Sequence, residues 1–229
     1  PNAEQAILET TGSAQLLTLF TTSLTTGLKG TNLRQLAEAW GALFSNHYLS
    51  AEELVDEMQR GEHRLGAANE QILKDFLRTD CRNGGAFVLN VIKKGGNIDR
   101  AALIMIADLE DLAGIEHNGT TAVHLLADAC DKWVRPVFIR KAGKRLLSGV
   151  FDSRGIPVIF TLFSLADLSL HDLDAIAAVL SEEDLKNTMS RNRTGRHALT
   201  VFTETARSLR SHGSLERHTF FGTSARKDL

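Results

Sequence analysis

The sequence predicts an all-α protein built from repeated helix pairs. Glycines suited to tight turns recur at Gly84, Gly119, Gly155 and Gly195, at intervals of 35, 36 and 40 residues. An apolar segment typical of a helix start follows each of these glycines, and the end of a second helix precedes the last three. Because only three of the 229 residues are proline, little interrupts helix formation. This alternation of helix, reversal and helix indicates a repeat architecture.

The segment from residue 118 to residue 127, Asn-Gly-Thr-Thr-Ala-Val-His-Leu-Leu-Ala, carries the strongest local pattern in the chain. Gly119 tolerates the positive φ of a tight turn. Thr121 is placed to cap the next helix by accepting from its first backbone N–H groups. Val123 and Leu126 then fall on one helical face, three residues apart. The segment therefore predicts a tight turn followed at once by a buried helix.

This pattern resembles the signature of the ankyrin-repeat family, in which a glycine-containing turn precedes Thr-Pro-Leu-His and a helix of small residues. Pro157 stands where the signature has its proline, after a one-residue deletion, and only the unit at Gly119 carries both threonine and histidine. The resemblance covers roughly residues 80–210. It implies an ankyrin-like helical repeat solenoid that binds other proteins through its concave face. It also implies that His124 hydrogen-bonds within and between neighbouring repeats.

The first 80 residues are expected to form helices that repeat less clearly. An amphipathic face is formed by Leu33, Leu36, Ala37, Trp40 and Phe44. Ser50 and Glu53 have the spacing of a capping box, and a further helix is expected near residues 67–77. Because a solenoid needs an end unit with a polar outer face, we assign residues 1–80 to an N-terminal helical cap or subdomain. The alternative is an independent helical domain or a linker.

The predicted repeat region spans residues 81–210 and ends with an inner helix over residues 196–208. Residues 211–229 are polar and lack helical periodicity, so we expect a flexible C-terminal tail whose one apolar cluster is the pair Phe220 and Phe221. Since residue 1 is proline and not methionine, the chain is expected to be a fragment or a processed product.

Composition bears on the partners and the compartment. A formal net charge of −2 and a pI near 6.5 give no bias toward nucleic acid or membranes. The stretch between residues 9 and 29 is uncharged, but ten of its residues are Ser, Thr or Gln. A spanning helix needs roughly 20 predominantly apolar residues, so no membrane segment is expected. Cys81 and Cys130 lack metal-ligand spacing and are expected to be reduced thiols in a cytoplasmic compartment.

No pattern typical of a catalytic, cofactor or metal site stands out. The chain lacks the Gly-x-Ser-x-Gly elbow, the Gly-x-x-x-x-Gly-Lys-Ser/Thr loop and the Gly-x-Gly-x-x-Gly pattern. Its eight histidines include no pair four residues apart, the spacing of a helical metal site. We therefore predict a protein-interaction module without catalysis, cofactor or metal. The alternative is an α/β enzyme domain, since residues 86–92 and 156–163 are apolar enough to be buried strands.

Partner contacts are expected on the projecting loops and on the exposed side of the inner helices. Rigidly held loops with charged, polar and occasional aromatic side chains are typical of recognition surfaces. The predicted partner-binding residues are Glu116, His117, Asn118, Asp128, Lys132, Phe151, Asp152, Arg154, Arg191 and Arg193. Trp133 either adds to this surface or belongs to the core.

A basic cluster lies between residues 132 and 151, which include six cations and no acid. The cations are Lys132, Arg135, Arg140, Lys141, Lys144 and Arg145. On a continuous helix, two like-charge pairs would lie four residues apart, each unfavourable by roughly 0.2–0.5 kcal/mol. An acidic partner or internal acids should offset this repulsion; the candidate acids are Glu110, Asp111, Asp172 and Asp174. A solvated outer face is the simplest interpretation. Nucleic acid is not expected, because aromatics are not interleaved with the cations.

The general layout is also similar to the terminal domain of the type III ADP-riboxanase family of bacterial secreted effectors, which engages host caspases. That resemblance implies a substrate-recognition domain that acts inside a host cell, with the catalytic domain outside these 229 residues. The sequence determines neither the partner nor the oligomeric state.

Overall fold

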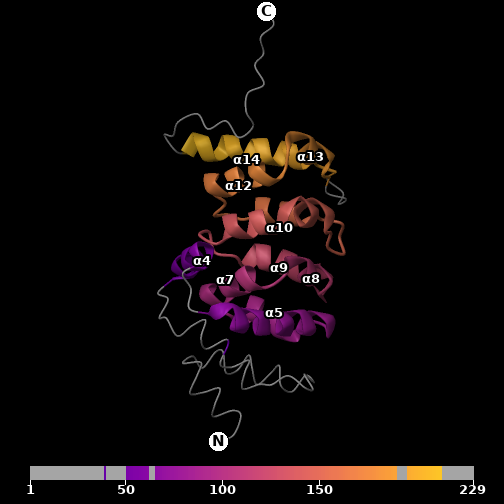
Figure 1. Cartoon of the computed structure of the whole chain (residues 1–229). Helices are drawn as coiled ribbons and strands as arrows, with labels where there is room; N and C mark the ends of the chain where they lie inside the picture. Colours follow the sequence, from indigo (N-terminus) through magenta and orange to yellow (C-terminus); the bar gives the residue numbers. More distant parts are fainter. Residues whose placement is uncertain (1–38, 40–49, 62–64, 190–194, 213–229) are drawn as a thin grey trace, which may run out of the picture. The chain divides into compact units, whose positions relative to one another are not determined.

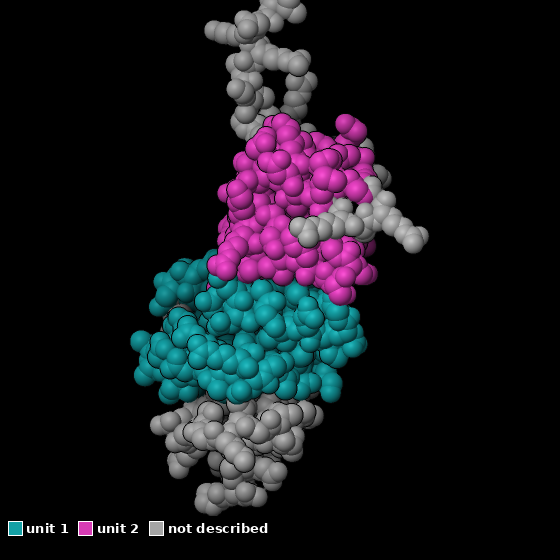
Figure 2. Space-filling view, turned by 90° about the vertical axis from the view of Figure 1, so that its right-hand side faces the viewer, with its two compact units in different colours: residues 1–134 teal, residues 135–229 magenta. Residues whose placement is uncertain are grey.

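The computed structural model describes residues 50–61, 65–189 and 195–212, together with Ala39. Within these residues the chain forms eleven helices and two short strands, so the prediction of an all-α protein is confirmed (Figure 1). The helix expected over residues 33–44 lies outside the described residues apart from Ala39, which is helical and buried. The chain divides into two compact units, residues 1–134 (unit 1) and 135–229 (unit 2), shown in teal and magenta in Figure 2.

Unit 1 contains six described helices and one hairpin. Their bounds are α4 (Ala51–Arg60), α5 (Gly66–Arg82), α6 (Ala86–Lys94), α7 (Asn97–Ile106), α8 (Leu109–Ala113), β1 (Glu116–His117), β2 (Thr120–Thr121) and α9 (Ala122–Ala129). Helix α4 packs against α7, and α5 packs against α6 and α8. The helix predicted near residues 67–77 lies within α5, and the boundary expected after residue 80 falls inside the same helix.

The start of α4 follows the predicted capping pattern. The Ser50 hydroxyl oxygen accepts the N–H of Glu53 at 3.1 Å, which satisfies one of the unpaired amides of the first turn. Leu54 and Val55 of this helix are buried. The Ser50 half of the predicted capping box is therefore confirmed.

The junction between α5 and α6 is held by a buried carboxylate and a buried glycine. Asp80 is 3% exposed and accepts the N–H groups of Phe87 at 3.2 Å and Val88 at 3.0 Å, which caps α6 from the preceding helix. Gly85 has φ of +67°, and a Cβ there would stand 2.3 Å from Ile115 Cδ1. Only glycine satisfies both the backbone and the space at this position. The Phe87 ring then packs edge-on against the ring of Phe76 at 5.0 Å.

Unit 2 contains five helices among its described residues. Their bounds are α10 (Arg135–Gly149), α11 (Val158–Phe163), α12 (Leu170–Val179), α13 (Glu182–Asn187) and α14 (Ala198–His212). Helix α10 packs against α11 and α12, and α14 packs against α11, α12 and α13. Phe163 and Phe202 meet at 6.3 Å in this core. Helix α14 runs two residues into the predicted tail, and residues 213–229 lie outside the described part.

The alternative of an α/β enzyme is wrong for the two segments on which it rested. Residues 86–92 lie within α6, and residues 158–163 of the second segment form α11. Both segments are helices buried on one side. In an apolar run as short as these, the spacing of the apolar residues does not distinguish a buried helix from a buried strand.

Helix α10 is broken at Gly143, whose φ of 64° and ψ of 178° are not helical. A residue with a Cβ is strained at that φ, so the glycine permits the break. The two like-charge pairs predicted across this point, Arg140 with Lys144 and Lys141 with Arg145, are therefore not stacked on a continuous helix. The prediction of i,i+4 repulsion is wrong, because a change of direction separates the members of each pair.

A common order of elements recurs along the chain. Two helices are followed by a third short helical segment and a loop in α6–α7–α8, in α9 with the two halves of α10, and in α11–α12–α13. The short segments α8 and α13 were not expected from the sequence. Asp108 and Ser181 begin them by accepting backbone N–H groups of Glu110 and Asp184.

Candidate partner-binding loops

Three reversals precede helices α9, α11 and α14, and a similar backbone hydrogen bond closes each of them. We call them the first loop (115–121), the second loop (150–157) and the third loop (188–197). The N–H of the residue that begins the next helix donates to a carbonyl at the start of the loop. The pairs are Ala122 to Ile115 at 2.8 Å, Val158 to Val150 at 3.2 Å, and Ala198 to Thr188 at 2.8 Å. All four predicted turn glycines have positive φ, as expected.

The first loop is a two-residue hairpin that presents polar side chains. Strands β1 and β2 pair antiparallel, and the central residues Asn118 and Gly119 both have positive φ, at 53° and 76°. That combination is typical of a type I′ turn, which holds the loop in one conformation. Of the three predicted contact residues here, Glu116 and Asn118 are exposed and His117 is half-buried. The Asn118 amide and His117 Nε2 lie 3.2 Å apart.

Thr121 and His124 anchor the end of the first loop. Thr121 is the N-cap of α9, with its hydroxyl oxygen accepting from the N–H of His124 at 3.5 Å. The same hydroxyl lies 2.7 Å from His124 Nδ1, and both residues are buried. The imidazole therefore satisfies a buried polar group, which supports a structural role and leaves it inaccessible to a partner.

The second loop is built around Asp152, which was predicted to contact a partner. That prediction is wrong, because the Asp152 side chain is 1% exposed. Its carboxylate accepts the N–H groups of Arg154 at 2.9 Å and Ile156 at 2.8 Å, and the Arg154 guanidinium donates to it as well. Burial acts to raise the pKa of Asp152, but the N–H of Ile156 and the hydrogen bonds from Arg154 outweigh it and hold that pKa below its usual value. Asp152 shapes the loop from inside.

Arg154 and Phe151 remain the candidate contact residues of the second loop. The Arg154 side chain is 70% exposed although its guanidinium pairs with Asp152 at 2.7 Å. One face of the guanidinium is thus fixed, which reduces the entropy lost on binding a partner. Phe151 is half-buried and bridges to Pro157 across the loop.

The third loop is described at its two ends. Met189 and His197 form an antiparallel bridge, and Met189 is 42% exposed. The predicted contact residues Arg191 and Arg193 lie outside the described residues.

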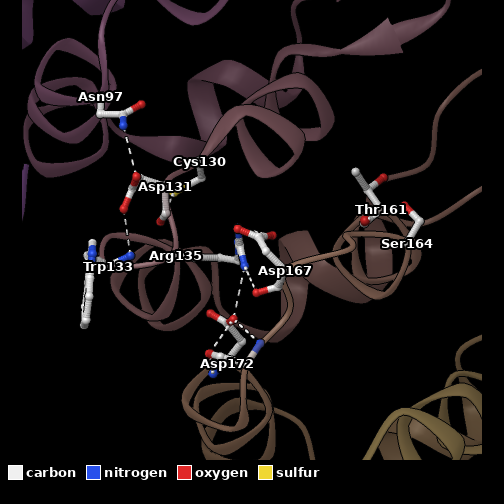
Figure 3. Close-up of polar contacts among 10 residues, drawn as sticks. Asn97, Cys130, Asp131, Trp133, Arg135, Thr161, Ser164, Asp167 and Asp172 are labelled. Atoms are coloured by element: carbon white, nitrogen blue, oxygen red, sulfur yellow. Dashed lines mark hydrogen bonds and ion pairs between the residues drawn. The ribbon is translucent and has the colours of Figure 1, made fainter. Parts of the chain in front are cut away.

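Unit 1 presents a further candidate surface between α9 and residue 134. Asp128 and Lys132 are exposed, as predicted for partner contacts. Trp133 is 56% exposed, which assigns it to the surface and not to the core. Asp131 fixes this turn: it accepts the N–H of Trp133 and the side-chain amide of Asn97, each at 3.0 Å (Figure 3). The Lys132 ammonium lies 5.1 Å from the centre of the Trp133 ring, within the range of a cation–π contact.

One cation of the basic cluster, Arg135, forms an ion pair with one of the predicted internal acids, Asp172. Arg135 is 2% exposed and lies between Asp172, at 3.1 Å, and Asp167, at 2.9 Å (Figure 3). Asp172 was among the candidate acids, whereas Asp167 was not, and the candidate Asp111 lies 3.6 Å from Arg78 instead. Burial acts to lower the pKa of Arg135, but the hydrogen bond to Asp167 and the charge of Asp172 raise it above its usual value. Arg135 is a structural cation.

Unit 2 also contains an open hollow of about 510 Å³ that the sequence did not indicate. Its lining residues are Lys144, Ser148, Phe151, Asp184, Asn187, Thr188 and Met189. The second half of α10, the start of the second loop, α13 and the start of the third loop each contribute. Four segments up to 45 residues apart in sequence build it, so no local pattern predicts it.

A reactive cysteine and a metal-binding group are two features typical of catalytic sites. Burial, followed by the charges of Asp80 and Asp111, raises the pKa of Cys81 to about 12, so this thiol is a poor nucleophile near neutral pH. Among the described residues, no three His, Cys, Asp or Glu side chains are grouped so as to hold a metal ion. Of the helices described, none combines the length and the apolar character needed to cross a membrane.

Comparison of the chain with family models, with curated proteins and with solved structures finds no match.

Proposed function

We propose that this chain is a protein-interaction module without catalytic activity, organised as ankyrin-like repeats, that recognises a partner protein through its projecting loops. The observation that carries the proposal is the recurrent loop closure before α9, α11 and α14. A backbone hydrogen bond closes each reversal and each contains a positive-φ glycine, while charged and polar side chains remain exposed on the described residues of the loops. Preorganised loops with exposed side chains favour binding because little order is lost on association.

The details of each loop separate its scaffold from its contact residues. Asp152, Thr121 and His124 are buried and hold the loop ends, whereas Glu116, Asn118 and Arg154 are exposed. Asp128, Lys132 and Trp133 add a second exposed group on unit 1, and the tryptophan ring is typical of an interface anchor. The resemblance to the ADP-riboxanase effectors makes host proteins the first partners to test.

The experiment is affinity capture by the full chain, with mass spectrometry of the captured proteins and calorimetric titration of the best candidate. The test variant changes only exposed loop residues, as E116K/N118A/R154Q. Arginine 154 is replaced by glutamine because a glutamate would face Asp152 and disturb the loop itself. We expect the variant to keep its helical circular dichroism and to bind at least about tenfold more weakly, as for the loss of contacts worth about 1.4 kcal/mol.

The matched control replaces two side chains outside the loops, in the variant K74M/H171A. The Lys74 side chain on α5 is 43% exposed, and His171 on α12 is exposed. This control variant should bind as the wild type does. Equal binding by the loop variant would refute recognition through these loops. Turnover of a captured protein by the chain alone would refute the absence of catalysis.

A further inference from the structure

We infer that the hollow of unit 2 is a peptide-docking site for a partner segment that carries an apolar side chain flanked by acidic residues. This inference rests on the proposed function and names the chemistry of the partner at one site. The hollow is the place where residues of the basic cluster and of the loops meet. Lys144 belongs to the cluster, and Phe151 is a predicted loop contact, yet both line the same surface.

The size of the hollow suits a few side chains of an extended segment. Its volume of about 510 Å³ lies in the range of sites that enclose small ligands, roughly 300–1,000 Å³. Phe151 and Met189 give it apolar surface on two different segments, and Met189 is 42% exposed. An aromatic or branched aliphatic side chain placed between them would bury apolar area on both, which is the usual composition of an interface anchor site.

Charge indicates which residues should flank that apolar side chain. The one acid among the lining residues, Asp184, already accepts from Lys144 at 2.5 Å and from the N–H of Ser181 at 3.1 Å. The hydrogen bond from Lys144, followed by those from Ser181, lowers the pKa of Asp184. Lys144 itself keeps 63% of its side chain exposed, so its ammonium can donate to a second carboxylate, from a partner.

Further exposed cations lie close to Lys144 in the sequence. Arg140 and Lys141 stand before the break at Gly143, and Arg145 directly follows Lys144; all are exposed, and no acid interrupts residues 132–151. An exposed lysine beside an acid that is already paired favours an acidic segment over a basic one.

The test uses four fluorescein-labelled hexapeptides and fluorescence anisotropy at low salt with the full chain. The first, Asp-Glu-Leu-Phe-Asp-Glu, carries both features. The others replace the acids by Asn and Gln, the apolar pair by two serines, or the acids by lysines. We expect the first peptide to bind at least about tenfold more tightly than each of the others, and to weaken as salt screens the charges.

Variants of the chain then place the site. K144M, F151A and M189A should each weaken binding of the first peptide about three- to tenfold. D184N should strengthen it, because Asp184 competes with the peptide for Lys144. The matched control is K74M, since Lys74 forms a comparable exposed pair with Glu70 on α5, at 2.6 Å. That variant should bind as the wild type does, and circular dichroism checks that each variant is folded.

Equal affinity for all four peptides, or full affinity of folded K144M and F151A, would overturn the inference. So would weaker binding by D184N with its helical content intact. Failure of the proposed function gives a different pattern, since it is tested at Glu116, Asn118 and Arg154, which do not line the hollow. A captured partner that depends on those loop residues but not on Lys144 would keep the function and reject the docking site.

Discussion

Replacing Arg135 by methionine should destabilise unit 2 more than any other single change considered for this protein. The Arg135 guanidinium is 2% exposed and donates to Asp172, which is fully buried, and to Asp167, which is 58% exposed. Methionine fills a similar volume without a charge, so the packing of the site is largely kept. What the substitution leaves behind is the buried carboxylate of Asp172 without its cation.

The expected loss follows from the two partners taken separately. Breaking a buried ion pair by removing one member costs about 3–5 kcal/mol. Asp172 keeps the hydrogen bonds from the N–H and hydroxyl of Ser169, at 2.8 and 2.7 Å, so the lower end of that range applies. The pair with Asp167 adds less than about 1 kcal/mol, because that carboxylate is largely solvated. We expect R135M to lower the free energy of unfolding by about 3–4 kcal/mol.

Urea unfolding followed by circular dichroism at 222 nm measures this loss, and a double-mutant cycle tests its cause. D167A should cost less than about 1 kcal/mol and serves as the control for the exposed half of the network. R135M/D172N should recover at least about 1 kcal/mol relative to R135M, because the stranded charge is removed while Ser169 keeps an acceptor. A stability of R135M within about 0.5 kcal/mol of wild type, or strictly additive losses in the double variant, would refute the argument.

Three further substitutions test the loops and the helix break by the same urea unfolding. H124A should lose about 1–3 kcal/mol, because it removes the imidazole that lies 2.7 Å from the buried Thr121 hydroxyl. Unchanged stability with lost partner binding would make His124 a recognition residue. D152N should be less stable than wild type at pH 7. Because the pKa of Asp152 is lowered in the folded protein, the stability difference between D152N and wild type is complete above pH 3.8 and shrinks as the pH falls through the folded pKa. A stability difference that stays constant down to a pH of about 2 would contradict the role given to the Asp152 carboxylate. G143A should cost about 1–3 kcal/mol from backbone strain alone, since a Cβ there meets no atom within 4 Å, and φ of +64° with ψ of 178° is a conformation that only glycine adopts readily. An equally stable variant would show that the break can relax.

The sequence predicted the features that short-range chemistry determines. The positive φ of Gly119, Gly155 and Gly195 and the cap formed by Thr121 depend on a few adjacent residues, so the pattern of residue types sufficed. The all-α class followed from apolar periodicity over whole helices. The short helices α8 and α13 were missed, although Ser181 and Asp184 have the spacing of a capping box, because acidic residues next to a helix end also suit a solvated terminus.

The candidate site was less predictable because its residues act over long distances in sequence. Asp152 is a charged residue in a loop, as many recognition residues are. Only its hydrogen bonds from the N–H groups of Arg154 and Ile156 show that its carboxylate holds the loop from inside. Arg135 looked like one cation among six, and its partners lie 32 and 37 residues away. The hollow is lined by both Lys144 and Met189, which are 45 residues apart in the sequence, so no local pattern predicts that they share one surface.

The formal net charge of −2 therefore says little about the surface that a partner meets. In unit 2, Asp152 and Asp172 are buried, and each carries out a structural task inside the fold. The Asp152 carboxylate accepts backbone N–H groups, and the Asp172 carboxylate pairs with Arg135. By contrast, four cations are exposed: Arg140, Lys141, Lys144 and Arg145. Among the described residues of unit 2, two acids and one base are buried, so the exposed ones are more positive than the composition of that part suggests. Long-range attraction of an acidic partner depends on the exposed charges, so raising the ionic strength should slow association more than it speeds dissociation.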